Sequence, residues 1–174
     1  TGYNTKIFFS QIIQNKRHIG DCFQAQDPTQ EDGGDIVASD GGWITIPDIG
    51  RVVKMVQEGE ALFIVATNGT WKLAGSQGVG FTATDYSISK VSETGADSPR
   101  SFVLVEGTPI WWNVDGIWAI QSQNGMDKVV SMSKTTIASF LLEIPPANVA
   151  YVKGAYNPLT RVVQWLFRSA ASTS

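Results

Sequence analysis

Residues 61–74 read ALFIVATNGTWKLA, and this stretch decides the fold class. Two apolar, β-prone runs flank the dipeptide Asn68-Gly69. Asn-Gly between apolar strands is the strongest short hairpin signal, because these residues tolerate the positive φ that a type I′ turn needs at both central positions. The stretch therefore predicts a tight antiparallel hairpin.

A second stretch, residues 109–120, reads PIWWNVDGIWAI and repeats the first one. Asp115-Gly116 stands 47 positions after Asn68-Gly69, and Trp118 stands 47 positions after Trp71. Upstream of each hairpin, residues 52–59 resemble residues 101–107, now at an offset of 48 from Gly59 to Gly107. We assign the one-residue slip to a loop or bulge difference. A unit of about 47 residues with at least three strands is close to the period of β-propeller blades.

The repeat predicts an all-β fold of antiparallel, blade-like units: a partial β-propeller with one short connector helix. The apolar runs do not alternate with polar residues, so we expect sheets that are covered on both faces, as stacked blades are. The predicted units of this one domain are 5–48, 49–96, 97–145 and an incomplete 146–174. The 174 residues hold about 3.7 such units, whereas closed propellers have about four to eight blades. We therefore expect the chain to be a fragment of a longer protein.

The flanking segments predict further elements. One helix is expected over 135–142, capped by Ser133 and ended by Pro145-Pro146. A polar loop is expected over 27–34. Strands are expected over 5–10, 19–24, 43–46, 149–156 and 161–167.

Composition restricts the classes of function. The net charge is −3, so there is no overall basic field to attract nucleic acid. We interpret the scattered cations as solvated surface: Lys16, Arg17, Arg51, Lys54, Lys153, Arg161 and Arg168. The single cysteine, Cys22, excludes an internal disulfide and is expected to be a small core residue. We expect no signal peptide, and no apolar run is long enough to span a bilayer.

The residues predict no enzyme, no metal site and no cofactor. His18 is the only histidine, and no Gly-x-Ser-x-Gly motif accompanies it. The acidic residues Asp27, Glu31, Asp32 and Asp35 miss the spacing of a calcium loop. The glycine-rich residues 75–80 lack the Lys-Ser/Thr of a phosphate loop.

Two sets of repeated or aromatic residues remain as candidates. Glu58 and Glu106 fall at matching repeat positions beside glycines, which favours a scaffold role over a pair of glycosidase carboxylates. Trp71 and Trp118 recur with the repeat and are expected in the core. Trp43 and Trp112 are the best candidates for exposed, sugar-binding aromatics.

Several short motifs, taken in their order, resemble the β-propeller region of podophage tail nozzle proteins, also called tail tubular protein B. The resemblance covers roughly residues 5 to 168. The motifs are Phe8-Phe9-Ser10-Gln11, Ile19-Gly20-Asp21-Cys22-Phe23-Gln24 followed by Asp27-Pro28-Thr29, Asp40-Gly41-Gly42, Ile44-x-Ile46-Pro47, Asn68-Gly69-Thr70-Trp71, residues 80–88 (GFTATDYSI) and Trp111-Trp112-x-x-Asp115-Gly116-Ile117.

The resemblance implies a structural role in the virion. Nozzle proteins form a ring, typically a hexamer, below the portal and the adaptor (the head–tail connector). Tail fibres or spikes attach around that ring, and DNA passes through it during ejection without sequence-specific binding. Two alternatives stay open: a receptor- or carbohydrate-binding propeller module, and a propeller hydrolase with converging carboxylates.

Overall fold

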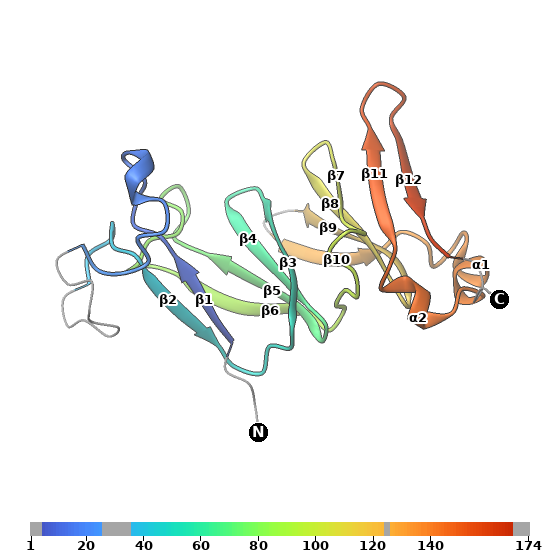
Figure 1. Cartoon of the computed structure of the whole chain (residues 1–174), viewed down its shortest axis with the longest axis horizontal. Coiled ribbons are helices and arrows are strands. Elements are labelled where there is room, and N and C mark those ends of the chain that lie inside the picture. Colours follow the sequence, from blue (N-terminus) through green and yellow to red (C-terminus); the bar gives the residue numbers. More distant parts are fainter. Residues whose placement is uncertain (1–4, 26–35, 124–125, 169–174) are drawn as a thin grey trace.

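The computed structural model describes residues 5–25, 36–123 and 126–168. Its elements are antiparallel strands with a few short helical turns (Figure 1). The strands are β1 (Thr5–Phe9), β2 (Gly42–Ile46), β3 (Val52–Glu58), β4 (Ala61–Ala66), β5 (Gly69–Ala74), β6 (Ser87–Ser92), β7 (Val103–Val105), β8 (Thr108–Asn113), β9 (Gly116–Gln123), β10 (Met126–Ser131), β11 (Lys153–Asn157) and β12 (Val162–Leu166). The helical segments are η1 (Lys16–His18), α1 (Ala138–Leu142) and α2 (Pro146–Val149).

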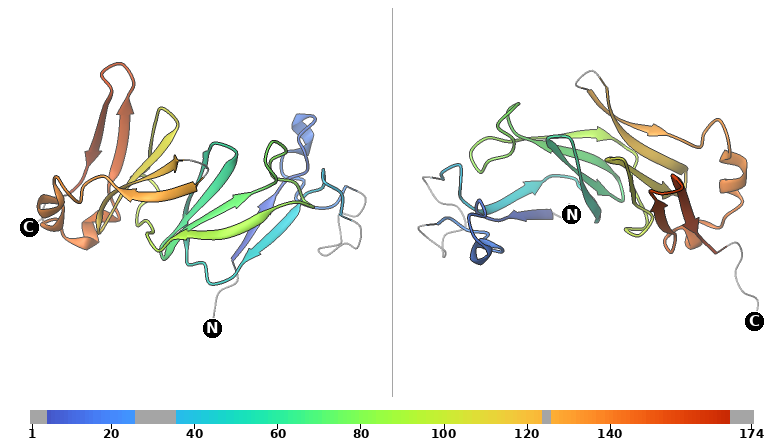
Figure 2. Two further views of the ribbon diagram at one scale, coloured as in Figure 1. Left: turned by 180° about the vertical axis from the view of Figure 1, so that it is seen from behind. Right: turned by 90° about the horizontal axis from the view of Figure 1, so that it is seen from above.

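The strands form four antiparallel sheets in chain order. β1 pairs with β2, β3 to β6 form a four-stranded meander, β7 to β10 form a second meander, and β11 pairs with β12. Each sheet lies within one of the four ranges expected for the repeat units. The sheets follow one another along the molecule (Figures 1 and 2). They do not close into a barrel over the described residues, so the predicted all-β antiparallel class is confirmed and the propeller stays a prediction.

Hydrophobic clusters fill the space between neighbouring sheets. The cluster between the first two sheets includes Ile44, Ile64 and Trp71. The next one, between the two meanders, includes Phe63, Val65, Trp111 and Ile120. The last one joins β8 and β9 to α1, α2 and the β11–β12 hairpin, and it includes Trp112, Leu141 and Val149.

Alternation along β4 shows why its sequence is apolar throughout. Ile64 and Ala66 face the first cluster, while Phe63 and Val65 face the second. Successive side chains of a strand point to opposite faces, so a strand buried on both sides needs apolar residues at every position. The predicted burial on two faces is thus confirmed for this strand.

Both predicted hairpins form, but their turn type differs from the prediction. Ala66 pairs with Gly69 and Asn113 pairs with Gly116, so the central turn residues are 67–68 and 114–115. None of these has a positive φ; the glycines themselves take φ values of 151° and 133° at the start of β5 and β9. A Cβ at Gly116 would lie 2.4 Å from Ser133 Oγ. Glycine is therefore required by its positive φ and by the close approach of the neighbouring segment, and not by a type I′ turn.

The predicted offset of 48 upstream of the hairpins is wrong. Glu58 pairs with Ala61 in one sheet and Val105 pairs with Thr108 in the next, which is an offset of 47. Glycine occupies the first turn position at Gly59 and the second at Gly107. Matching glycine to glycine in the sequence therefore introduced a slip that the strands do not have.

The predicted strand over 19–24 is also wrong. Gly20 has a φ of 98°, and the Cys22 N–H bonds back to the Gly20 carbonyl at 2.8 Å, so the chain turns there. β1 pairs with β2 instead. The predicted polar loop over 27–34 lies outside the described residues.

The connector region between β10 and β11 differs in detail from the prediction. α1 is shorter than the expected helix over 135–142, and the Ser133 hydroxyl accepts a hydrogen bond from the Ile117 N–H at 3.0 Å instead of capping α1. Pro146 begins α2, which replaces the start of the strand expected over 149–156. Among the described residues, no helix is long and apolar enough to cross a membrane.

Candidate functional site

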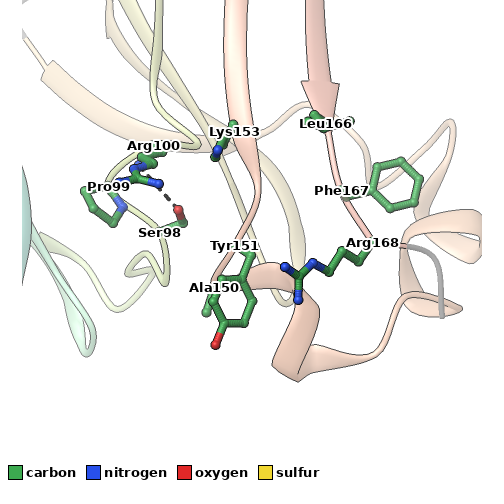
Figure 3. A pocket seen from close by; sticks show the side chains of 9 residues that line it. All are labelled: Ser98, Pro99, Arg100, Ala150, Tyr151, Lys153, Leu166, Phe167 and Arg168. Atoms are coloured by element: carbon green, nitrogen blue, oxygen red, sulfur yellow. Dashed lines mark hydrogen bonds between the residues drawn. The ribbon is translucent and has the colours of Figure 1, made fainter. Parts of the chain in front are cut away.

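A cleft of about 600 Å³ lies where the second meander meets the β11–β12 hairpin (Figure 3). The segment before β7, the segment before β11 and the end of β12 form its walls. Its lining residues are Ser98, Pro99, Arg100, Ala150, Tyr151, Lys153, Leu166, Phe167 and Arg168.

Hydrogen bonds hold these walls in place. The buried Ser98 hydroxyl donates to the Val152 carbonyl at 2.9 Å. The Gly154 N–H donates to the Arg100 carbonyl at 2.8 Å, and the Trp165 indole donates to the Ser101 carbonyl at 3.0 Å. Since these bonds join segments more than 50 residues apart, the cleft is defined by tertiary structure.

Three cations surround the cleft. Arg100, Lys153 and Arg168 are exposed, and none of them forms an ion pair with a carboxylate of the described residues. The Arg168 guanidinium lies over the Tyr151 ring, 5.1 Å from its centroid (Figure 3). The remaining aromatic residue of the lining is the half-buried Phe167.

The interpretation of the basic residues as scattered is therefore wrong for two of them. Lys153 and Arg168 lie in one cleft together with Arg100, which the sequence did not single out. Positions 100, 153 and 168 have no spacing that indicates proximity. The only local signal is the pairing of Lys153 with Leu166 in an expected hairpin, which places residues near Arg168 at the same end.

A second charged cluster joins the two meanders. Lys72 on β5 pairs with Asp127 on β10, with 2.5 Å between Nζ and Oδ2. Burial raises the pKa of Glu58 on β3, and the nearby Asp127 carboxylate raises it further, against the Lys72 charge. Burial also acts to raise the pKa of Asp127, but hydrogen bonds from Lys72 and Ser122 and the Lys72 charge lower it below its ordinary value.

The two glutamates that the sequence placed at matching repeat positions are not equivalent in the structure, because Glu58 ends β3 whereas Glu106 lies in the turn after β7. Glu58 belongs to the Lys72–Asp127 cluster, whereas the exposed Glu106 faces Arg161 at 4.0 Å. Their carboxylates have separate partners, so the structure does not form them into a glycosidase-like pair.

The fold buries the candidate tryptophans to different extents. Trp71 is buried in the cluster between the first two sheets. Trp118 is half-buried against the cluster between the meanders. Trp112, a candidate for an exposed aromatic, is only 3% exposed and packs edge-on against Trp165. Trp43 is half-buried, with the Lys6 ammonium 3.6 Å from its ring centroid and its indole N–H without a hydrogen-bond partner.

The other candidate residues do not come together in a site within the described part of the chain. His18 lies in η1, Cys22 is half-buried in a loop rather than in a core cluster, and residues 75–80 form a turn between β5 and β6. Asp27, Glu31, Asp32 and Asp35 lie outside the described residues. Over residues 5–25, 36–123 and 126–168, no three His, Cys, Asp or Glu side chains gather closely enough to hold a metal ion.

Comparisons of the chain with models of protein families, with curated proteins and with solved structures found no match.

Proposed function

We propose that this chain is a structural virion protein: a bacteriophage tail nozzle component that assembles with copies of itself into a ring below the portal–adaptor complex. Its four sheets represent successive blades of a β-propeller. Adaptor and tail fibre or spike proteins are its partners, and DNA passes through the assembly during ejection. The order of the short motifs supports this proposal, as does a construction from stacked antiparallel sheets.

The observation that carries the proposal is the outer face of the β11–β12 hairpin. Trp165 and Val163 point inward, whereas Val162 and Leu166 point outward and are 45% and 71% exposed. The other sheets of this chain bury most of their apolar side chains against a neighbour, although Phe8 on β1 and Leu104 on β7 are also exposed. This outward face also carries Gln164, and its exposed Val162 and Leu166 side chains favour coverage by another sheet or another protein, which is how an assembling module gains its contact area.

Cryo-electron microscopy of the virion tests the proposal directly. We expect density for this chain in a ring around the tail axis. Density elsewhere in the particle, or its absence from the particle, overturns the proposal.

A variant tests the role of the exposed face. Val162→Asp places a charge on that face outside the basic cleft and is expected to prevent assembly measured by light scattering. Leu104→Asp, at a 56% exposed position on β7, is the matched control and is expected to assemble normally. Equal assembly of both variants overturns the role of the face.

The alternative of a receptor- or carbohydrate-binding module has weaker support. Of its two aromatic candidates, Trp112 is buried and the Trp43 ring is covered by Lys6. A glycan array with the folded chain distinguishes the two functions, because specific hits that Trp43→Ala abolishes would favour the binding module.

A further inference from the structure

We propose that the basic cleft binds single-stranded nucleic acid, with Arg100, Lys153 and Arg168 contacting phosphates and the Tyr151 ring stacking on a base. This inference goes beyond the proposed function and does not rest on ring assembly.

The charge of the cleft carries the first step. The chain as a whole has a net charge of −3, yet three cations meet here without a carboxylate partner among the described residues. Like charges gathered at one place repel each other, so an anion between them lowers their electrostatic energy. The cleft therefore selects an anionic ligand.

The hydrogen-bonding chemistry of the lining carries the second step. The guanidinium groups of Arg100 and Arg168 and the ammonium of Lys153 only donate, and no carboxylate or amide side chain lines the cleft. The Ser98 hydroxyl is already engaged with Val152 and with the Arg100 N–H. Sugars and polypeptides present donors that need acceptors, whereas a phosphodiester backbone presents only acceptors. The lining thus suits an acceptor-rich anion such as a phosphodiester backbone better than a neutral glycan.

The aromatic side chain carries the third step. Tyr151 is 61% exposed and one of its faces is held against Arg168 (Figure 3). Exposed aromatic rings beside cations are the usual platform for unpaired bases, whose faces are free. Bases within a duplex are already stacked, so the cleft favours a single strand over a duplex.

Binding of a fluorescent twelve-nucleotide oligothymidylate to the full chain, followed by anisotropy at 50 to 200 mM salt, tests this inference. Three phosphate contacts predict a slope of log K against log salt of about −2, because each contributes about −0.7 for a single strand. Affinity should therefore fall roughly sixteenfold over that range. No binding at 50 mM salt overturns the proposal.

Variants assign the binding to the cleft. Lys153→Gln and Arg100→Gln should each reduce the slope by about 0.7. Lys128→Gln, an exposed lysine on β10 away from the cleft, is the matched control and should leave both affinity and slope unchanged. Thermal melting of each variant verifies its fold. Equal effects at Lys128 and Lys153, or no effect at either, overturn the assignment.

Competitors define the ligand. Tyr151→Leu should weaken oligothymidylate binding about tenfold, consistent with loss of one stacked base, and should leave binding of inorganic tripolyphosphate unchanged. Duplex DNA should compete less well than the single strand. Tighter binding of oligoglutamate than of the oligonucleotide, or equal binding of an abasic strand, overturns recognition of a nucleic acid.

Discussion

Lys72 Nζ lies 2.5 Å from Asp127 Oδ2, and this ion pair joins the two meanders beside the apolar cluster that separates them. The Asp127 side chain is only 6% exposed, while that of Lys72 is 28% exposed. A carboxylate this deeply buried is stable in its ionised form only with a cation or hydrogen-bond donors beside it. The pair is therefore part of what fixes the relative position of the sheets.

Lys72→Met is expected to lower the free energy of unfolding by about 2 kcal/mol, because Asp127 keeps its burial and loses its cation. Lys128→Met, at an exposed position on β10 next to Asp127, is the control and should change stability by less than about 0.5 kcal/mol. Urea denaturation measures both. A double-mutant cycle with Asp127→Asn that gives no coupling would contradict this account.

Glu58 predicts a dependence of stability on pH. Its pKa is raised in the folded protein above the ordinary value of 4.5, so the folded state binds this proton more tightly than the unfolded state. Ionisation of Glu58 therefore opposes folding above its folded pKa, and the penalty disappears below the unfolded value of 4.5. Glu58→Gln should be more stable than the natural chain at pH 7, with the difference vanishing below pH 4.5.

The control for this change is Glu106→Gln, at a 70% exposed carboxylate outside the Lys72–Asp127 cluster, which should change stability at pH 7 by less than about 0.5 kcal/mol. Denaturation curves collected from pH 4 to pH 8 provide the comparison. If Glu58→Gln is the less stable protein at pH 7, the lost attraction to Lys72 exceeds the relief of burial and the prediction is wrong.

The pH dependence of stability expected from Asp127 has the opposite sign. Its pKa is lowered from 3.8, so its ionised form stabilises the fold above the unfolded value. This contribution should be lost as the pH falls through the folded pKa, below 3.8. Acid unfolding followed by circular dichroism should therefore begin at a higher pH in Lys72→Met, since the substitution removes the group that keeps the pKa low. An unchanged acid transition argues against the ion pair as the cause.

Gly116→Ala should destabilise the fold by about 3 kcal/mol, since a Cβ would meet Ser133 Oγ at 2.4 Å and φ is 133°. Gly107→Ala is the matched comparison, because its φ is 91° but no atom lies within 4 Å of the added Cβ. That change should cost only about 1 kcal/mol. Thermal unfolding of the two variants separates the cost of the positive φ from the cost of crowding at Ser133. Equal costs would show that crowding at Ser133 plays no part.

Trp111→Leu should cost about 3 kcal/mol, because the ring is fully buried and its indole donates to the Gly95 carbonyl at 3.0 Å. Trp43→Leu should cost clearly less, since Trp43 is half-buried and its indole N–H has no partner to lose. Equilibrium denaturation ranks the two variants. A larger loss at Trp43 would contradict the assignment of Trp111 to the core between the meanders.

The local pattern of the chain predicted much of the architecture. The runs around Asn68-Gly69 and Asp115-Gly116 predicted two hairpins, and both form. Their uniform apolarity predicted burial on both faces, which the alternation of Phe63 and Ile64 between two clusters confirms. These features depend on residues close in sequence, so the sequence alone was sufficient to predict them.

The predictions of the turn type, the helix cap and the strand over 19–24 were wrong because contacts with segments far along the chain determine the structure there. Gly116 combines a φ of 133° with the close approach of Ser133, and the Ser133 hydroxyl accepts from the Ile117 N–H instead of capping α1. Residues 19–24 have a strand-like pattern, yet β2 takes the place beside β1. No window of neighbouring residues contains this information.

By itself, the sequence determined most of the strands, both hairpins, the repeat of 47 residues and the burial of Trp71, because strand pairing across short turns and apolar burial are dictated by near neighbours. Only the tertiary structure decided which charges meet. Stacking of the meanders brings Lys72 to Asp127, and docking of the β11–β12 hairpin brings Lys153 and Arg168 to Arg100. The physical reason is that sheet stacking depends on the packing of whole faces, so it joins residues whose separation along the chain carries no signal.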